Sequence, residues 1–394
     1  MSNNALNDRK TKKSGKKLTV RQKIIVALGG ILCAAIIVLA ASYGVFLHYY
    51  NKMNITSIDD DDEIVTAIDY EEDEINENTL TDEERAQLDE LMNGTDPAES
   101  GEEQTKPDEK KDDKKDDKKE KAVTNVDSKD VTNILLVGTD SRLKGNRRSR
   151  TDTMVILSID RKNKKLIMTS VLRDTYVKIP GVGNNRLNAA FVFGGPKLLF
   201  KTFDQNFDIH LDKYVQIDFF NFVKLVDAVD GVDMKLSEAE IKVMNKSYIP
   251  YIDEYLNKKR DAHLIKVNSS GNYHLNGIQA LAYSRVRYVG HGDFGRTERQ
   301  RKVMTQIIKK TKGLSVSELN ELADIVLPMV STNLSQGEVM SLLLNAKEYL
   351  NYKIVNGRMP IDGSYKYLTI RKASVLGVDF DKNRKYWYNL VYGQ

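Results

Sequence analysis

The chain has 394 residues, a formal net charge of +4 and a single cysteine. This length allows one large domain, or two ordinary ones with appendages. Because Cys33 is the only cysteine, an intramolecular disulfide and a metal site built from cysteines are both excluded. The charge is segregated: net +7 for residues 1–23 (8 basic, 1 acidic), −17 for residues 52–122 (10 basic, 27 acidic) and +14 for residues 123–394 (42 basic, 28 acidic).

The N-terminal region has the pattern of a membrane anchor. Residues 1–23 are polar and basic, and residues 24–47 contain no charged side chain. A helix of that length spans roughly 36 Å, more than the about 30 Å of a hydrocarbon core. The basic flank before it and the acidic flank after it predict a cytoplasmic tail and an exported remainder. A signal peptide cleaved near residues 40–42 is the alternative, but its apolar region would be shorter, so we favour an uncleaved signal-anchor.

Residues 48–125 have the composition of a linker. Residues 59–63 are an unbroken acidic run, and residues 110–121 alternate pairs of Lys and Asp. Such segments cannot bury enough apolar area to offset the entropy of the chain. We predict a disordered, charged extracellular stalk, followed by a globular domain over residues 126–394.

Strand and helix patterns are mixed throughout this domain. Three apolar runs, at residues 134–137, 154–159 and 166–172, predict strands, and the spacing of the last two admits a hairpin. We therefore expect an α/β or α+β sandwich with a mixed sheet. Further patterns predict helices over residues 196–207, 219–229, 277–286, 296–312, 316–330 and 337–352, and strands over residues 214–217, 232–236 and 365–370.

Acids and arginines accompany the first strands. Carboxylates can hold a hard cation and arginines can hold phosphate oxygens, so this combination predicts phosphate chemistry. The alternative is a set of ordinary surface ion pairs. The sets are Asp140 with Arg142, Arg150 with Asp152, and Arg173 with Asp174.

A second polar segment, YSRVRYVGHGDFGRTERQ, runs from residue 283 to 300. Arg285 and Arg287 alternate, which would direct both to the same side. The glycines around Asp293 permit an unusual backbone there. Arg296 and Gln300 lie one turn apart near a predicted helix start, which is a favourable place for an anion.

A helix with a solvated basic face is the alternative for the second half of this segment. It accounts for Arg299, Arg301 and Lys302, but not for the glycine-rich loop.

A series of motifs, in chain order, resembles the LytR-CpsA-Psr (LCP) family. The likeness covers roughly residues 126–305, with the core motifs at residues 134–305. The motifs are GTDSR at 138–142, RTDTM at 150–154, SVLRDTYVKIPG at 170–181, RLNAAFVFGG at 186–195, VDAVDGVD at 226–233, LNGIQALAYSRVR at 275–287 and GDFGRTERQ at 292–300.

The resemblance implies a three-layer α-β-α sandwich around a mixed central sheet, on the cell membrane of a Gram-positive bacterium. It implies a Mg²⁺-dependent phosphotransferase whose substrate is an anionic glycopolymer, such as wall teichoic acid or a capsular polysaccharide. The polymer would move from an undecaprenyl-pyrophosphate carrier to a hydroxyl group of peptidoglycan, forming a phosphodiester.

The resemblance also assigns roles residue by residue. Asp140 and Asp152 match the acids that hold Mg²⁺, and Asp293 matches an acid of the active-site loop. Asp140, Asp152, Arg173 and Asp293 are the catalytic candidates, while the base that activates the hydroxyl stays open among Asp140, Asp152, Asp174 and Asp293. The pyrophosphate-binding residues would be Arg150, Arg173, Arg285, Arg287, Arg296 and Gln300.

A carrier lipid requires an apolar groove, and the domain is rich in phenylalanine. We expect some members of one set to line such a groove: Phe191, Phe193, Leu199, Phe203, Phe219, Phe220 and Phe222.

Two other functions stay open. A lipid-pyrophosphate hydrolase or binding module would use the same arginines and acids. A transcriptional attenuator would need the basic domain in the cytosol, against the flanking charges, so we expect no nucleic-acid partner. No GxxxxGK[ST] loop occurs, which disfavours nucleotide hydrolysis.

Overall fold

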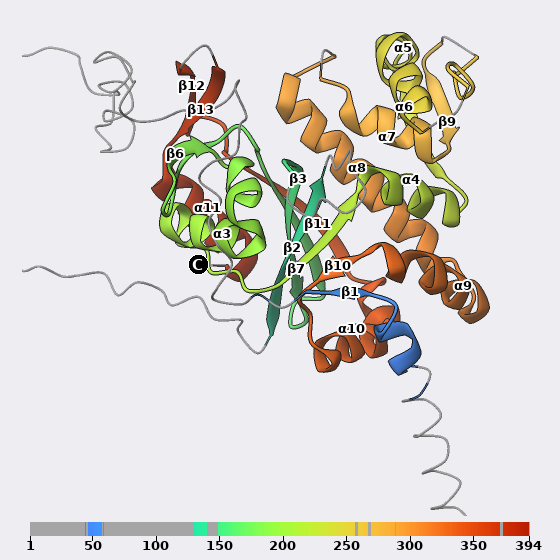
Figure 1. Ribbon diagram of the computed structural model, residues 1–394, viewed down its shortest axis with the longest axis horizontal. Helices are drawn as coiled ribbons and strands as arrows, with labels where there is room; N and C mark the ends of the chain where they lie inside the picture. The colour runs from blue at the N-terminus through green and yellow to red at the C-terminus, as the bar shows by residue number, and fades with distance from the viewer. Residues whose placement is uncertain are drawn as a thin grey trace, which may run out of the picture. The chain divides into compact units, whose positions relative to one another are not determined.

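Figure 1 shows the computed structural model of the chain. It forms two units, Met1–Asn51 and Lys52–Gln394. Among the residues that the structure describes, no helix is both long and apolar enough to cross a bilayer. The predicted anchor at residues 24–47 lies outside those residues, apart from 44, 46 and 47. The described residues are 44, 46–56, 58, 130–139, 149–256, 259–266, 269–287, 289–370 and 373–393.

The second unit is built on a seven-stranded sheet with the order β1-β10-β7-β2-β3-β4-β11. The pairs β2–β3 and β3–β4 are antiparallel, whereas β2–β7 and β4–β11 are parallel. The predicted mixed sheet and its opening hairpin are therefore confirmed. The strands are β1 (Asn54–Ile55), β2 (Val131–Thr139), β3 (Thr151–Asp160), β4 (Lys165–Val171), β7 (Tyr214–Asp218), β10 (Ser331–Thr332) and β11 (Lys353–Met359).

Strand β1 brings a distant segment to the edge of this sheet. Its two residues pair in parallel with β10, and they fall within the 48–125 stretch predicted to be linker. The remainder of that stretch, apart from residues 48–56 and 58, lies outside the described residues.

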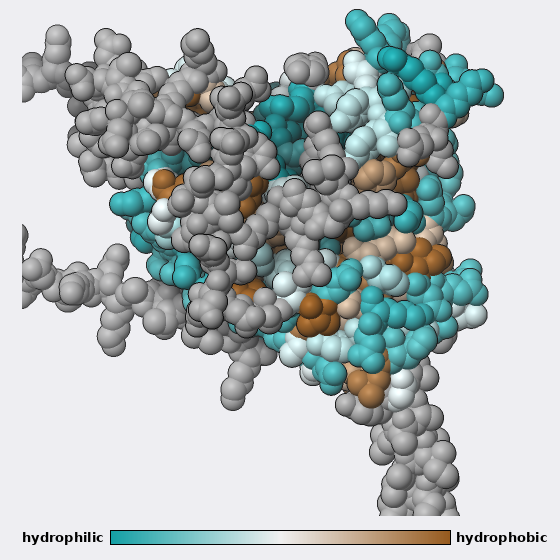
Figure 2. Space-filling view, viewed as in Figure 1, coloured by the Kyte–Doolittle hydropathy of each residue, from teal (hydrophilic) through white to brown (hydrophobic). Residues whose placement is uncertain are grey.

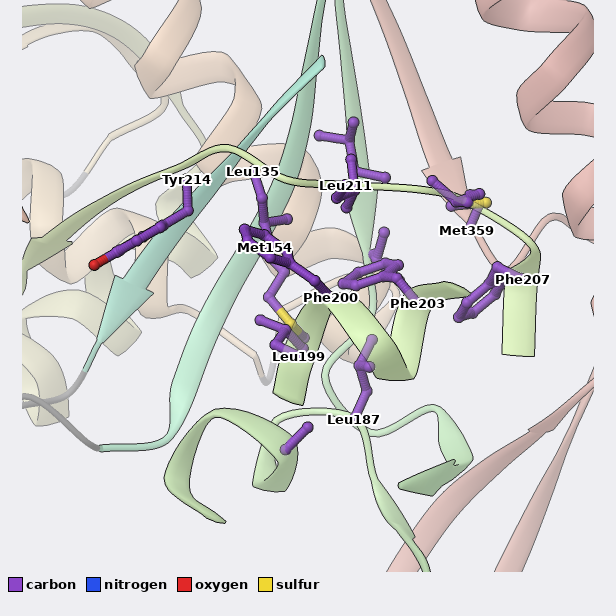
Figure 3. Close-up of a cluster of buried hydrophobic side chains, with 14 of the residues drawn as sticks. Leu135, Met154, Leu187, Leu199, Phe200, Phe203, Phe207, Leu211, Tyr214 and Met359 are labelled. Carbon is purple, nitrogen blue, oxygen red and sulfur yellow. The ribbon is translucent and has the colours of Figure 1, made fainter. Parts of the chain in front are cut away.

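One face of the sheet is covered by α3 (Ala189–Phe207) and α11 (Phe380–Tyr392). Side chains alternate between the two faces of a strand. Leu135 and Met154 point to this face, where Leu199 and Phe200 of α3 lie beside Met154 (Figure 3). Helix α3 is interrupted by non-helical glycines at 194 and 195, so its regular part begins at Pro196, where the pattern predicted a helix start.

Helices α4 (Phe219–Ala228), α7 (Gly277–Arg285), α8 (Gly292–Lys312) and α9 (Val316–Val326) lie on the other side of the sheet in Figure 1. Helix α9 continues into a 3₁₀ turn at Leu327–Met329. Helix α10 (Gln336–Tyr349) supports the same face lower down, where Leu342 and Tyr349 pack with Leu157. The predicted covering of the sheet by helices is confirmed.

Smaller units surround this framework. A core of its own holds together the hairpin β8–β9, α5, a π-helical turn and α6 beside α7. Two further hairpins, β5–β6 and β12–β13, stand near the residues that follow β4. Their bounds are β5 (Tyr176–Ile179), β6 (Gly183–Arg186), β8 (Val232–Leu236), α5 (Glu238–Val243), the π-helix (Met244–Tyr248), α6 (Ile249–Tyr255), β9 (Gly271–Leu275), β12 (Tyr365–Ile370) and β13 (Ala373–Val378).

Candidate active site

A cavity of about 820 Å³ lies between the sheet and the helices α4, α7, α8 and α9. Its lining is mostly apolar: strand residues such as Leu136, Leu157 and Ile217 form one wall, and helix residues such as Phe222 and Ile307 form the other. Figure 2 shows hydrophobic side chains at the surface where α4 and α9 lie. The charged and amide side chains of the lining are Asp152, Arg173, Asp218, Arg285, Arg287, Arg296 and Gln300.

An ion pair between Asp152 and Arg173 stands at the end of the β3–β4 hairpin. The ladder pairs Val155 with Ser170 and Ile156 with Thr169, and the same register continued outward sets Asp152 opposite Arg173. The hairpin therefore brings together two residues that are 21 positions apart in the chain.

The charge of Asp152 is stabilised by its neighbours. Burial opposes ionisation of this carboxyl group, but Arg173, Arg296 and Arg285 outweigh the effect and hold its pKa below the ordinary 3.8. Asp152 is therefore a carboxylate at neutral pH.

The start of α8 supplies a second part of the site. Asp293 pairs with two arginines: Nη2 of Arg287 donates to its Oδ2 at 2.7 Å, and Nη2 of Arg296 lies 2.9 Å from its Oδ1 in an ion pair. Gly290 and Gly292 turn the chain into the helix with φ of +79° and +56°. The helix begins earlier than predicted, so Asp293 lies in its first turn rather than in an open loop, where its charge complements the helix dipole.

These residues form a charged cluster with four arginines and three aspartates: Asp152, Arg173, Asp174, Arg285, Arg287, Asp293 and Arg296. Burial, followed by repulsion from Arg173, lowers the pKa of Arg296 to about 10, although Asp293 and Asp152 act in the opposite direction. Arg173 is also 3.5 Å from Asp174, which in turn is 3.3 Å from Arg186. The lowered pKa of Arg296 therefore reflects its burial first and the positive charge of Arg173 second.

Most of the predicted site residues lie together. Asp152, Arg173, Arg285, Arg287, Arg296 and Gln300 line the cavity, and Asp293 joins them through its two ion pairs. Arg150 is half-buried and is not among the lining residues. Asp140 lies outside the described residues.

The structure divides the phenylalanine-rich set that was predicted to contain the lipid groove. Phe219 and Phe222 line the cavity. Phe220 lies in a small separate pocket, with its ring 4.9 Å from that of Tyr255. The other four members belong to the filled core between α3 and the sheet: Phe191, Phe193, Leu199 and Phe203. The sequence could not separate the two groups, because periodicity does not tell which face of the sheet a helix will cover.

The alternative interpretation of α8, a solvated basic face, does not hold for two of its arginines. Arg299 is buried and donates to Glu240 at 2.8 Å and to the carbonyl oxygens of Val286 and Val289. It thereby fixes the backbone on both sides of Arg287. Arg301 is buried as well, with its exposed fraction at 8%.

Sequence reasoning missed this positioning role. One signal was available, because the Ser237–Glu240 pair forms a capping box that fixes Glu240 at the start of α5, where it meets Arg299. Lys302, in contrast, is exposed and pairs with Glu298 at 2.8 Å, as the solvated-face interpretation expected.

The carboxylates of the described residues are suitable ligands for a magnesium ion, but by themselves they do not complete a metal site. Within the part of the chain that the structure describes, no three His, Cys, Asp or Glu side chains gather closely enough to hold a metal. Of the two predicted ligands, Asp152 is described, and its anionic carboxylate is the type of ligand that Mg²⁺ prefers.

Comparison with known proteins identifies the family. The chain is 32% identical over 256 residues to regulatory protein MsrR of Staphylococcus aureus, which covers 64% of this chain and 72% of that protein. It is also 32% identical over 230 residues to polyisoprenyl-teichoic acid–peptidoglycan teichoic acid transferase TagU of Bacillus cereus, covering 57% and 67%. A solved structure, TagT bound to LI-WTA, matches with a TM-score of 0.53 at 25% identity, over 68% of this chain and 94% of that one. Residues 100–390 match the LytR_cpsA_psr family model, and the chain therefore belongs to the LytR_cpsA_psr family.

Proposed function

We propose that this protein transfers an anionic glycopolymer from a polyprenyl-pyrophosphate carrier to a hydroxyl group of peptidoglycan. The protein is an enzyme, a glycopolymer–peptidoglycan phosphotransferase. One observation carries the proposal: four arginines, one of them buried and three partly buried, lie together in the wall of a large apolar cavity. Family membership and the transferase name of the relative TagU support the same reaction.

The two parts of the site match the two parts of a lipid pyrophosphate. Arg173, Arg285, Arg287 and Arg296 present guanidinium groups that bind phosphate oxygens bidentately. The apolar lining accommodates a hydrocarbon chain, which gains free energy by leaving water. A diphosphate would also bring negative charge to Arg296, which is subject to the positive charges of Arg173 and Arg287.

The reaction is a phosphoryl transfer. The acceptor hydroxyl attacks the phosphorus that carries the glycopolymer, the bond from that phosphorus to the bridging oxygen breaks, and lipid monophosphate leaves. Arginines neutralise the charge that develops on the phosphoryl oxygens, which is the main contribution a protein makes to such a step. The proton of the hydroxyl passes to a carboxylate, for which Asp152, Asp174 and Asp293 are available in the described cluster.

Magnesium belongs to this proposal. Asp152 would hold it together with Asp140, the residue after Thr139, whose partner across the ladder is Thr151. The ion would supply further neutralisation of the pyrophosphate oxygens.

The proposed setting is the outer face of a Gram-positive cell membrane. A cytoplasmic tail (1–23), a membrane helix (24–47) and a charged extracellular linker (48–125) would precede the catalytic domain (126–394). The uncharged segment and the opposite charges of its two flanks support this arrangement. Undecaprenyl pyrophosphate would be the carrier, and we expect no nucleic-acid partner.

The test uses the full chain in detergent with Mg²⁺, a lipid-pyrophosphate-linked oligosaccharide and a peptidoglycan oligomer. Mass spectrometry detects the phosphodiester product. Arg173→Ala should lower the rate by about 10²–10³-fold, because a buried group that binds the transferred phosphoryl is lost. The matched control is Arg384→Ala on α11, which removes an arginine from a partly exposed pair with Asp381 and should leave the rate unchanged.

Other outcomes discriminate between the alternatives. Release of lipid phosphate without a joined product would make the protein a hydrolase and reject the transferase. Tight binding of the lipid substrate without any turnover would make it a binding module.

A further inference from the structure

A pair of tyrosines, one partly buried and one exposed, stands on β12. Tyr365 and Tyr367 point to the same face of the strand because they are two residues apart, and their rings are 5.8 Å apart at 85°. Tyr367 is 66% exposed, an unusually large fraction for an aromatic side chain. Leu368 and Ile370, in contrast, are buried in a small core. Tyr367 therefore presents a large ring to solvent without filling a core.

This pair is fixed to the charged cluster through α8. The ring of Tyr365 packs at 4.8 Å on that of Phe294, the residue that follows Asp293. Phe294 also carries the guanidinium of Arg358 at 4.4 Å from its ring centre. A chain of contacts therefore runs from Asp293, through the neighbouring Phe294, to Tyr365 and then to Tyr367. Arg358 packs on the same ring of Phe294.

The second strand of the hairpin is fixed to the cluster independently. In β13 the backbone N–H of Leu376 donates to the carbonyl oxygen of Asp174 at 2.9 Å, and Leu376 bridges to Thr175. Burial, the neighbouring Tyr365 and the charge of Asp293 raise the pKa of Tyr367, which agrees with this closeness. The hairpin is therefore positioned relative to the site by contacts on both strands.

The geometry of phosphoryl transfer requires separate places for the acceptor and for the lipid. The attacking and leaving oxygens lie roughly in line with phosphorus, so the acceptor approaches from the side opposite the lipid phosphate. The apolar cavity would hold the lipid, and no residue of β12 or β13 is among its lining residues. The hairpin borders the cluster at Asp174 and Asp293 and is outside the cavity.

The chemistry of the patch fits a saccharide. The faces of aromatic rings are negative, and the C–H face of a pyranose ring is weakly positive and apolar, so the two stack. A nearby guanidinium, that of Arg358, can donate to hydroxyl or carboxylate oxygens of the sugar.

We propose that Tyr365 and Tyr367, together with Arg358, form a subsite that binds the sugar rings of the acceptor glycan beside the charged cluster. This inference rests on the proposed function, because it assigns a binding surface to the acceptor of that reaction.

The test measures glycan binding and transfer separately. The probe is a tetramer of alternating N-acetylglucosamine and N-acetylmuramic acid, titrated calorimetrically into the full chain without lipid substrate. Tyr367→Ala should weaken binding about fivefold, as expected for the loss of one aromatic stacking contact, whereas Tyr367→Phe keeps the ring and should bind like the wild type. Lys366→Ala, an exposed change on the opposite face of the same strand, is the matched control and should also bind like the wild type.

In the transfer assay the Tyr367→Ala change should raise KM for the acceptor by the same factor and leave the affinity for the lipid substrate unaltered. Equal glycan affinity in the wild type and in Tyr367→Ala would overturn the subsite, as would an equal loss in Lys366→Ala. If the glycan binds through Tyr367 but no joined product forms, the subsite stands and the transferase is rejected. If product forms with an unchanged acceptor KM in Tyr367→Ala, the transferase stands and the subsite is rejected.

Discussion

The two faces of the central sheet are made by the same strands and are covered in different ways. On one face, Leu135 and Met154 meet the phenylalanines of α3, and the space is filled. On the other, Leu136 and Leu157 border a cavity of about 820 Å³ below the helices α4, α8 and α9. Because neighbouring residues of a strand point to opposite faces, a stabilising core and a binding cavity are encoded in alternate positions of one sequence.

This difference shows that apolar residues in a strand do not all have the same role. Leu135 is fully buried, whereas its neighbour Leu136 is only partly buried. The filled face supplies free energy of folding, and the hollow face keeps apolar surface available for an occupant. The first two of the following predictions compare one residue on each face, and the third concerns a charged residue at the cavity.

The largest expected effect comes from truncating one phenylalanine on each face. Phe203→Ala removes a fully buried ring of α3 and should lower the free energy of unfolding by about 3–5 kcal/mol, since a cavity is left in a packed core. Phe222→Ala enlarges a cavity that already exists and should cost about 1 kcal/mol or less. Urea unfolding of both variants measures the difference. Equal losses would show that the two faces are packed alike.

A second comparison fills the hollow face. Ile217→Trp places an indole in the cavity and should weaken binding of the lipid substrate about two-hundredfold, if it displaces about four methylene groups at about 0.8 kcal/mol each. Its stability should stay near that of the wild type. Leu135→Trp, on the filled face, should instead destabilise the fold by about 1–3 kcal/mol through overpacking. Lipid affinity and urea midpoints report the two effects, and unaltered lipid affinity in Ile217→Trp would place the lipid elsewhere.

The smallest effect concerns pH. The folded protein holds the pKa of Asp152 below 3.8, so the carboxylate contributes stability that is fully present above pH 3.8 and is lost as pH falls through the lower folded-state pKa. Each unit of lowering corresponds to about 1.4 kcal/mol. In Asp152→Asn this acid-dependent part should be absent, so the curves of wild type and variant should converge below pH 3.8. Curves that stay parallel from pH 7 to pH 3 would show that Asp152 has an ordinary pKa when folded.

Much of the framework could be predicted because it depends on local patterns. The three first strands, the antiparallel hairpin and most later helices follow from periodicity and from turn residues. The charged cluster could be predicted as a set of residue types, and the register of one hairpin is enough to bring Asp152 and Arg173 together.

The remainder depends on contacts that sequence periodicity does not contain. The same pattern of phenylalanines describes Phe203, in the filled core, and Phe222, in the cavity wall, because the assignment of a helix to a face is a property of the whole fold. Arg299 has the spacing of a solvated residue, but it is buried in contact with Glu240, 59 positions away, and with the carbonyl oxygens of Val286 and Val289. Strand β11 pairs with β4, although most of the domain's sequence lies between them, and no local pattern predicts this pairing.

The hollow face of the sheet has a thermodynamic consequence. An apolar ligand would fill the cavity between the sheet and the helices, and it would bind only to the folded chain. Linkage then requires that free lipid at a hundred times its dissociation constant stabilises the folded state by about 2.7 kcal/mol. The melting temperature of this protein should therefore depend on the supply of carrier lipid. When that supply falls, the population of unfolded chains open to proteolysis rises, so the abundance of the protein would follow the availability of its substrate.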